Sequence, residues 1–137
     1  MNKKLYLGVD VGTFETKGVL VDNKGFIHNQ AVIKHEMIVP KPGWAEHSAK
    51  EVWWGDFVNI TKQLLKNKKI SVDRIKSVAV SAIGPCMLPI DKDANPLYSG
   101  VLYGIDTRAK EEIKYINQII GEEEIFGFGG NALTSQS

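Results

Sequence analysis

Cysteine is almost absent from this sequence, which has only Cys86 among its 137 residues. No disulfide can form within the chain, which fits a reducing compartment such as the cytoplasm. An excess of one charge is lacking too, because 17 lysines and arginines face 16 aspartates and glutamates. Nothing therefore favours nucleic acid or a membrane surface as a partner. No apolar run approaches the ~20 residues of a membrane span, and the run after the basic start breaks at Asp10 without a signal-peptide cleavage site.

Two common phosphate-binding patterns are missing as well. Neither Gly-x-x-x-x-Gly-Lys-Ser/Thr nor Gly-x-Gly-x-x-Gly occurs, so the sequence is not that of a P-loop or a dinucleotide-binding motif. It has no internal repeat and no low-complexity segment. The length suits one modest domain with a real core.

Three strands are predicted at the start of the chain. Leu5–Val9 is apolar almost throughout, as is typical of a buried strand, and Gly18–Val21 is predicted to be its antiparallel partner. Asp22–Gly25 is a turn signal, after which Phe26–Lys34 forms a third strand. The sequence therefore opens with a three-strand antiparallel meander.

The loop of the first hairpin carries the first candidate site. Gly12 can take backbone conformations closed to other residues and lets a ligand come close. Thr13 and Thr16 add hydroxyl donors to backbone N–H groups that can cradle an anion. Asp10 supplies a carboxylate of the kind that orders Mg²⁺ and its waters near phosphates. We predict a phosphate site here, and a polar hairpin turn without a ligand is the alternative.

A helix and a fourth strand follow the meander. The helix is predicted from Ala49, because Ser48 and Glu51 form a capping box. Ser77–Ser81 is the strand after it, and this strand–helix–strand order indicates a mixed sheet covered by helices.

The last third of the chain is expected to be less regular. Short strands are predicted at Met87–Ile90 and Val101–Tyr103. A helix over Thr107–Ile120 follows, capped by Asp106 or by its own first residue. Gly127–Ser137 is Gly-rich and polar, and no closing element is expected there.

Several stretches resemble known families. Asp10-Val11-Gly12-Thr13 resembles the first phosphate motif of the actin-like ATPase superfamily, which includes sugar kinases, chaperone ATPases and actin. Four later stretches are similar, in the same order, to the FGGY carbohydrate kinases: Pro42–Ser48 to their Pro-Gly-Trp-x-Glu segment, Ala79–Pro85 to their sugar-facing strand and loop, Leu102–Ala109 to their Trp-x-Asp-x-Arg segment with one inserted residue, and Gly130–Thr134 to a later loop. The resemblance runs nearly end to end.

The resemblance implies an α/β fold that is ribonuclease H-like, with a mixed sheet that opens with the meander and is flanked by helices. FGGY kinases have two such domains and are much longer. Residues 1–137 are therefore expected to be a truncated N-terminal portion of domain I, without the rest of domain I and all of domain II. The family's catalytic base lies beyond Ser137, so no catalytic residue is named and the fragment alone is expected to be inactive.

The implied reaction is transfer of the γ-phosphoryl group of ATP to a sugar or polyol hydroxyl, with ATP and Mg²⁺ as cofactors. By resemblance, Asp10 acts on Mg²⁺ through water, and Gly12 and Thr13 lie against the phosphates. Thr16 and Lys17 are further phosphate candidates. A solvated surface lysine is the alternative for Lys17.

The implied sugar site includes Tyr103, which can stack on a sugar ring, and Asp106, which can accept hydroxyl hydrogen bonds. Core packing and a helix cap are their respective alternatives. Gly84 and Pro85 lie in the sugar-facing loop, where glycerol kinases have Arg-Glu and xylulose kinases have Met-His. The loop offers no polar side chain here, which puts both of those substrates in doubt. Arg108 is expected to brace its helix.

The three histidines have no metal-ligand spacing and are expected at the surface or in loops: His28, His35 and His47. Two other functions stay open, a complete non-catalytic remnant acting as a sugar- or protein-binding module, and a different actin-like ATPase. The expected partners are ATP and a sugar or polyol, with no nucleic acid and no membrane, and a homodimer of the parent is left open. The identity of the sugar is not determined.

Overall fold

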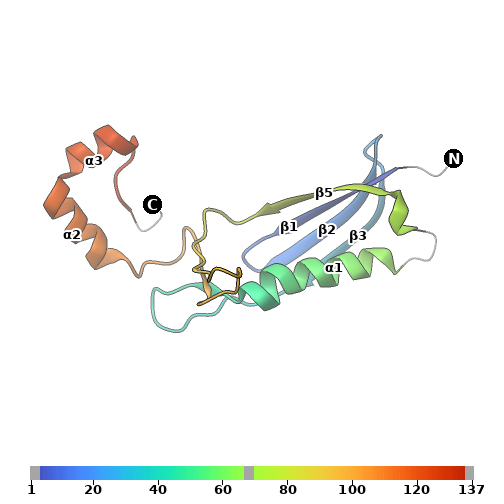
Figure 1. Cartoon of the computed structure of the whole chain (residues 1–137), viewed down its shortest axis with the longest axis horizontal. Coiled ribbons are helices and arrows are strands. Elements are labelled where there is room, and N and C mark those ends of the chain that lie inside the picture. The colour runs from blue at the N-terminus through green and yellow to red at the C-terminus, as the bar shows by residue number, and fades with distance from the viewer. Residues whose placement is uncertain (1–3, 67–69, 135–137) are drawn as a thin grey trace.

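A four-stranded mixed sheet forms the body of the protein in the computed structural model, which describes residues 4–66 and 70–134 (Figure 1). The strands lie in the order β3-β2-β1-β5. Their bounds are β1 Leu5–Val11, β2 Glu15–Asp22, β3 Ile27–Lys34 and β5 Ile75–Ala82. β1, β2 and β3 pair antiparallel, and β5 pairs parallel to β1. The predicted meander and mixed sheet are confirmed.

One long helical segment covers a single face of this sheet. It begins as a π-helix, η1 (Ala49–Gly55), and continues as α1 (Asp56–Leu65). Ser48 Oγ accepts a hydrogen bond from the Glu51 N–H at 3.2 Å, so the predicted cap is confirmed. Alternate residues of β1 face this helix, as the period of a strand requires. The buried apolar core is made of Leu5, Leu7, Val9, Val11, Leu20, Ile60, Leu64 and Ile70.

Gly18 lets the helix approach the sheet closely. A Cβ atom at this position would lie 2.9 Å from Leu64 Cδ1 and 3.0 Å from Ile60 Cγ1. These separations are shorter than carbon–carbon van der Waals contact. The missing side chain of Gly18 is therefore a packing requirement of the interface between β2 and α1.

Shorter elements lie at both ends of the sheet. β4 (Glu46–His47) and β6 (Gly100–Val101) form a second, two-stranded antiparallel sheet. β4 lies at the end where the β1–β2 hairpin loop is. A 3₁₀ turn, η2 (Val72–Arg74), leads into β5. The predicted strand at Met87–Ile90 is wrong, because only isolated bridges form there, from Met87 to Val101 and from Ile90 to Pro96.

Two helices end the described chain, α2 (Lys110–Ile120) and α3 (Glu122–Gly129). α2 starts three residues later than predicted. The predicted irregular stretch from Gly127 is wrong at its start, because Gly127 and Gly129 lie within α3.

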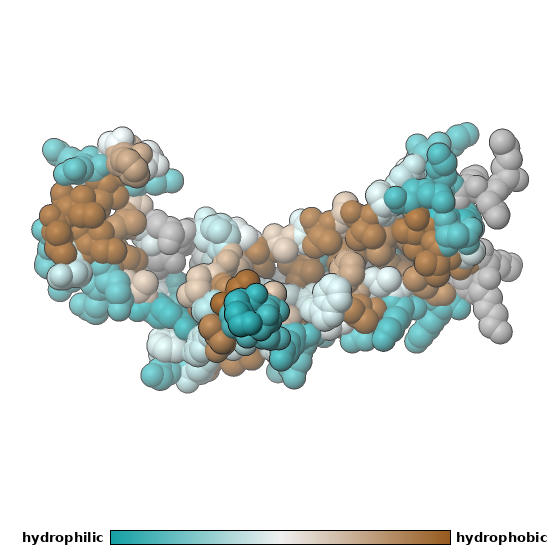
Figure 2. Space-filling model, viewed as in Figure 1, coloured by the Kyte–Doolittle hydropathy of each residue, from teal (hydrophilic) through white to brown (hydrophobic). Residues whose placement is uncertain are grey.

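Both helices stand apart from the sheet (Figure 1). Figure 2 shows apolar residues gathered on them, and Ile119 is 63% exposed. Residues 131–133 lie against part of this apolar surface, and Phe126 and Phe128 stay exposed. Within residues 4–66 and 70–134, no helix is long and apolar enough to cross a membrane.

Candidate functional site

Asp10 lies near the end of β1 between two polar neighbours. The strand registers place Lys17 of β2 and Ser81 of β5 directly beside it. All three line one shallow hollow of about 340 Å³ on the sheet. Within the part of the chain that the structure describes, the Asp10 carboxylate makes no hydrogen bond or ion pair. Ser81 was not named from the sequence, although the carboxyl ends of adjacent parallel strands meet at one edge of a sheet.

The hairpin loop consists of residues 12–14. The backbone N–H groups that are available to a ligand are those of Thr13 and Phe14, and not that of Gly12. The Gly12 N–H donates to the Glu15 carbonyl at 3.0 Å and is not available to a ligand. The N–H groups of Thr13 and Phe14 donate no hydrogen bond within the described residues. Gly12 does not adopt a left-handed φ. It is needed for a different reason, since a Cβ there would lie 3.1 Å from the Glu15 carbonyl oxygen.

Thr16 and Lys17 lie on opposite faces of β2, because neighbouring residues of a strand alternate. Thr16 is fully buried, and its hydroxyl donates to Asp56 Oδ2 at 3.0 Å. Its predicted contact with phosphate therefore has no support from the geometry. Lys17 is exposed, with Nζ 2.9 Å from Glu15 Oε1. The hydrogen bond and charge of Glu15 raise the pKa of Lys17, and the Asp10 carboxylate adds a smaller effect in the same direction.

The histidines match the sequence prediction only in part, since His35 lies in the loop after β3, as expected. His47 is fully buried in β4, so its expected surface or loop position is wrong. The His35 side chain is 6% exposed and contacts Asp56 on α1. Burial is the largest cause of the lowered pKa of His47, and the neighbouring His35 adds to it. The sequence spacing of His35 and His47 does not predict that their rings come into contact, because the contact depends on tertiary packing.

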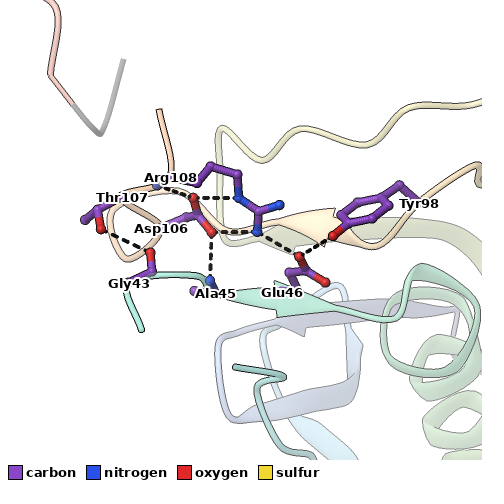
Figure 3. Close-up of polar contacts among 7 residues, drawn as sticks. All are labelled: Gly43, Ala45, Glu46, Tyr98, Asp106, Thr107 and Arg108. Atoms are coloured by element: carbon purple, nitrogen blue, oxygen red, sulfur yellow. Dashed lines mark hydrogen bonds and ion pairs between the residues drawn. The ribbon is translucent and has the colours of Figure 1, made fainter. Parts of the chain in front are cut away.

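Asp106 is held by protein donors on both carboxylate oxygens (Figure 3). Oδ2 accepts from the Ala45 N–H and from Arg108 Nη2, each at 2.7 Å. Oδ1 accepts from the Arg108 N–H and Nε, each at 2.9 Å. Burial opposes ionisation, but these hydrogen bonds outweigh it and the pKa of Asp106 lies below its usual value. The side chain is 5% exposed, so the geometry does not support a contact with sugar, and the predicted helix cap is wrong because Ala109 occupies that position.

Arg108 connects segments far apart in the sequence rather than bracing its own helix. Besides Asp106, Nη2 of Arg108 lies 2.8 Å from Oε1 of the buried Glu46. The Tyr98 hydroxyl donates to the same oxygen at 3.0 Å. The guanidinium also lies 4.0 Å from the ring centroid of Trp44, a cation–π contact. The hydrogen bonds to Asp106 are the largest cause of the raised pKa of Arg108.

The remaining predicted sugar residues lie at the surface. Tyr103 is 36% exposed, so it is not a core residue and remains a candidate platform for a sugar ring. Gly84 and Pro85 are exposed as well. The antiparallel bridge between Met87 and Val101 brings these two segments of the chain together.

A larger hollow of about 740 Å³ lies between η1 and β5, away from Asp10. Its lining includes Trp53, Phe57, Val80 and Leu88 and is largely apolar, so it offers little chemistry. Among residues 4–66 and 70–134, no group of three or more His, Cys, Asp or Glu side chains could hold a metal ion. Asp10 alone still suits Mg²⁺, which keeps several waters and binds through one or two carboxylates together with phosphates.

The fold is that of the actin-like ATPases, an α/β fold in which a parallel strand, β5, pairs with the first strand of an antiparallel meander. Residues 5–136 match the N-terminal domain of the FGGY family of carbohydrate kinases, and the chain belongs to that family. This membership excludes the chaperone and filament ATPases left open above.

Relatives and solved structures agree with this assignment. A glycerol kinase of Listeria welshimeri is 32% identical over 114 residues, which are 82% of this chain and 22% of that protein. Glycerol kinase of Plasmodium falciparum, solved with ADP, superposes with a TM-score of 0.82 at 23% identity, over 98% of this chain and 27% of that one. Xylulose kinase of Rhodospirillum rubrum gives a TM-score of 0.83 at 21% identity, over 97% of this chain and 27% of that protein. The chain thus spans about a quarter of the length of these proteins, and at such identities the two structures support the fold alone.

Proposed function

We propose that this chain is the N-terminal part of the first domain of an ATP-dependent kinase that phosphorylates a sugar or polyol hydroxyl. The observation that carries the proposal is the register of Asp10 with Lys17 and Ser81. Beside them is a hairpin loop with two N–H groups that donate to no acceptor among the described residues. A carboxylate, a cation and backbone donors together suit a metal–phosphate group. Family membership supports a carbohydrate as the acceptor.

In this proposal the chain contributes positioning and charge to an in-line transfer. Asp10 would hold Mg²⁺ through water, and the N–H groups of Thr13 and Phe14 would donate to phosphate oxygens. Bound Mg²⁺ would neutralise charge on the phosphates. Lys17 adds positive charge on the same face of the sheet.

On the sugar side, Tyr103 supplies an aromatic face and Gly84 and Pro85 lie in the adjacent loop. Asp106 supports this region from inside rather than touching the sugar. No residue of the chain is assigned to accept the hydroxyl proton, so the chain alone is expected to be inactive. The cytoplasmic location and the homodimeric parent stay predictions.

The first test is the intact mass of the gene product from its native source. A mass several times 15.2 kDa would identify a longer kinase, to be assayed for ADP release with glycerol, xylulose and gluconate. Asp10→Ala should abolish release, whereas the exposed Asp93→Ala should not. Unchanged turnover in Asp10→Ala would remove Asp10 from the mechanism. A mass near 15.2 kDa would contradict the kinase proposal and favour a non-catalytic binding module.

A further inference from the structure

Two buried histidines contact consecutive carbonyl groups of the hairpin loop. His35 Nε2 lies 3.1 Å from the Gly12 carbonyl oxygen, and His47 Nε2 lies 3.0 Å from the Thr13 carbonyl oxygen. The two rings meet edge to face, with centroids 5.0 Å apart. The histidines come from different segments, since His35 directly follows β3 and His47 lies in β4, and both contact this loop.

The protonation state of the His47 ring follows from its other nitrogen. Trp53 Nε1–H can only donate, and it lies 3.2 Å from His47 Nδ1. His47 Nδ1 therefore accepts, and the proton of the neutral ring sits on Nε2, which donates to the Thr13 carbonyl. A lowered pKa, caused mainly by burial, agrees with a neutral ring.

His35 has acceptors at both nitrogens. Nδ1 lies 2.7 Å from Asp56 Oδ2, which also accepts from the Thr16 hydroxyl, and Nε2 faces the Gly12 carbonyl. His35 therefore contacts the buried Asp56 through one ring nitrogen and the Gly12 carbonyl through the other, and these two contacts fix the orientation of its ring.

These contacts orient the free donors of the loop. In a trans peptide the C=O of one residue and the N–H of the next lie in one plane and point in opposite directions. Because the Gly12 carbonyl points to His35, the Thr13 N–H is directed away from His35. Because the Thr13 carbonyl points to His47, the Phe14 N–H is directed away from His47. Those are the two loop N–H groups that donate no hydrogen bond within the described residues.

We infer that His35 and His47 are positioning residues, which hold the Gly12–Thr13 and Thr13–Phe14 peptides so that two successive N–H groups face an incoming phosphate. The phosphate part of this inference rests on the proposed function. The histidine contacts do not, since they are formed within the protein.

The test is nuclear magnetic resonance of the ¹⁵N,¹³C-labelled chain at neutral pH. Long-range ¹H–¹⁵N correlations should show His47 as the neutral Nε2–H tautomer. His47→Ala should shift the Thr13 carbonyl ¹³C and the Phe14 amide signals, and His47→Gln, whose amide can still donate, should restore part of the shift. The control His28→Ala removes a ring held by Asp22 at 3.1 Å and should leave the loop signals unchanged.

Two outcomes would overturn the inference. One is a His47 ring protonated on Nδ1. The other is that His47→Ala leaves the Thr13 carbonyl and Phe14 amide signals unchanged. If His47→Ala does not fold, Trp53→Phe replaces it, and a mixture of His47 tautomers is then expected. Unaltered tautomers in Trp53→Phe would likewise count against the arrangement. In the longer kinase, unchanged ADP release in Asp10→Ala would overturn the proposed function alone, because the histidine contacts are formed within the protein.

Discussion

Arg108 and Glu46, 62 positions apart in the sequence, form a largely buried ion pair with Nη2 and Oε1 2.8 Å apart. The pair joins the segment around α2 to β4. The next residue of β4, His47, contacts the hairpin loop at Thr13. Neighbouring side chains of a strand point in opposite directions. Glu46 therefore contacts Arg108 on one side of β4, while His47 contacts the hairpin loop on the other.

The first prediction concerns the polar network. Asp106→Asn should lower the free energy of unfolding by about 2 to 3 kcal/mol, because it removes the carboxylate that pairs with Arg108 in a buried setting. Urea unfolding followed by tryptophan fluorescence measures the change. Asp93→Asn is the matched control, since Asp93 pairs with Lys92 at the exposed surface, and it should change stability by less than about 0.5 kcal/mol. Equal effects in the two variants would contradict the structural role of Asp106.

Packing at Gly18 gives a second prediction. Gly18→Ala should destabilise the protein by about 1 to 3 kcal/mol, because the added methyl group overpacks the contact with Leu64 and Ile60. Thermal unfolding followed by circular dichroism reports the loss. Gly127→Ala adds the same methyl group in α3, where no atom lies within 4 Å, and should be neutral or stabilising by up to about 1 kcal/mol. A Gly18→Ala protein as stable as the original would show that α1 does not pack as described.

Thr16 and Lys17 are predicted to differ in what their substitution changes. Thr16→Val should cost about 1 to 2 kcal/mol of stability, since it removes a buried hydrogen bond to Asp56. Lys17→Met should change stability by less than about 0.5 kcal/mol, because its ion pair with Glu15 is exposed. In the longer kinase, Lys17→Met should weaken ATP binding, as titration calorimetry would show. Unaltered affinity would restrict Lys17 to a surface role.

Acid should weaken the fold through His47. Its pKa is lowered in the folded protein, so the unfolded chain binds the proton more readily once the pH falls below the ordinary histidine value near 6.5. Stability is therefore complete above that value and declines as the pH falls toward the folded pKa. The groups around the ring act in both directions, since His35 lowers the pKa while the Thr13 carbonyl and Asp56 raise it.

Chemical denaturation at a series of pH values between 7.5 and 5 checks this decline. His47→Gln should flatten the curve in this range, because glutamine does not titrate. His28→Ala serves as the control and should retain the slope. A slope unaffected by His47→Gln would assign the acid sensitivity to another group.

The isolated chain should bind Mg-ATP weakly or not at all, because it spans only about a quarter of the related kinases and the rest of the nucleotide site is expected outside it. Isothermal titration calorimetry of this chain with Mg-ATP should give no saturable heat. Tight, saturable binding would contradict the expectation and assign a complete nucleotide site to these residues.

Much of the fold could be predicted from local patterns. The apolar run at the start, the turn after Asp22 and the Ser48–Glu51 cap act through neighbouring residues, and the structure confirms each of them. The motif order likewise identified the family. The predictions failed where local signals conflict with distant contacts. The glycines of α3 concealed a helix, and Met87 forms a bridge with Val101 instead of a regular strand.

The chemistry of the individual side chains was decided by tertiary structure. Asp10, Lys17 and Ser81 meet because β1 lies between β2 and β5, and strand order is a property of the whole sheet. Thr16 faces the core because β2 already includes Glu15, so the side chains of both residues follow the alternation between the two faces of the sheet. His47 is buried against a loop 34 positions earlier in the chain. A sequence specifies which groups are present, but burial and hydrogen-bond partners depend on residues brought together only when the chain folds.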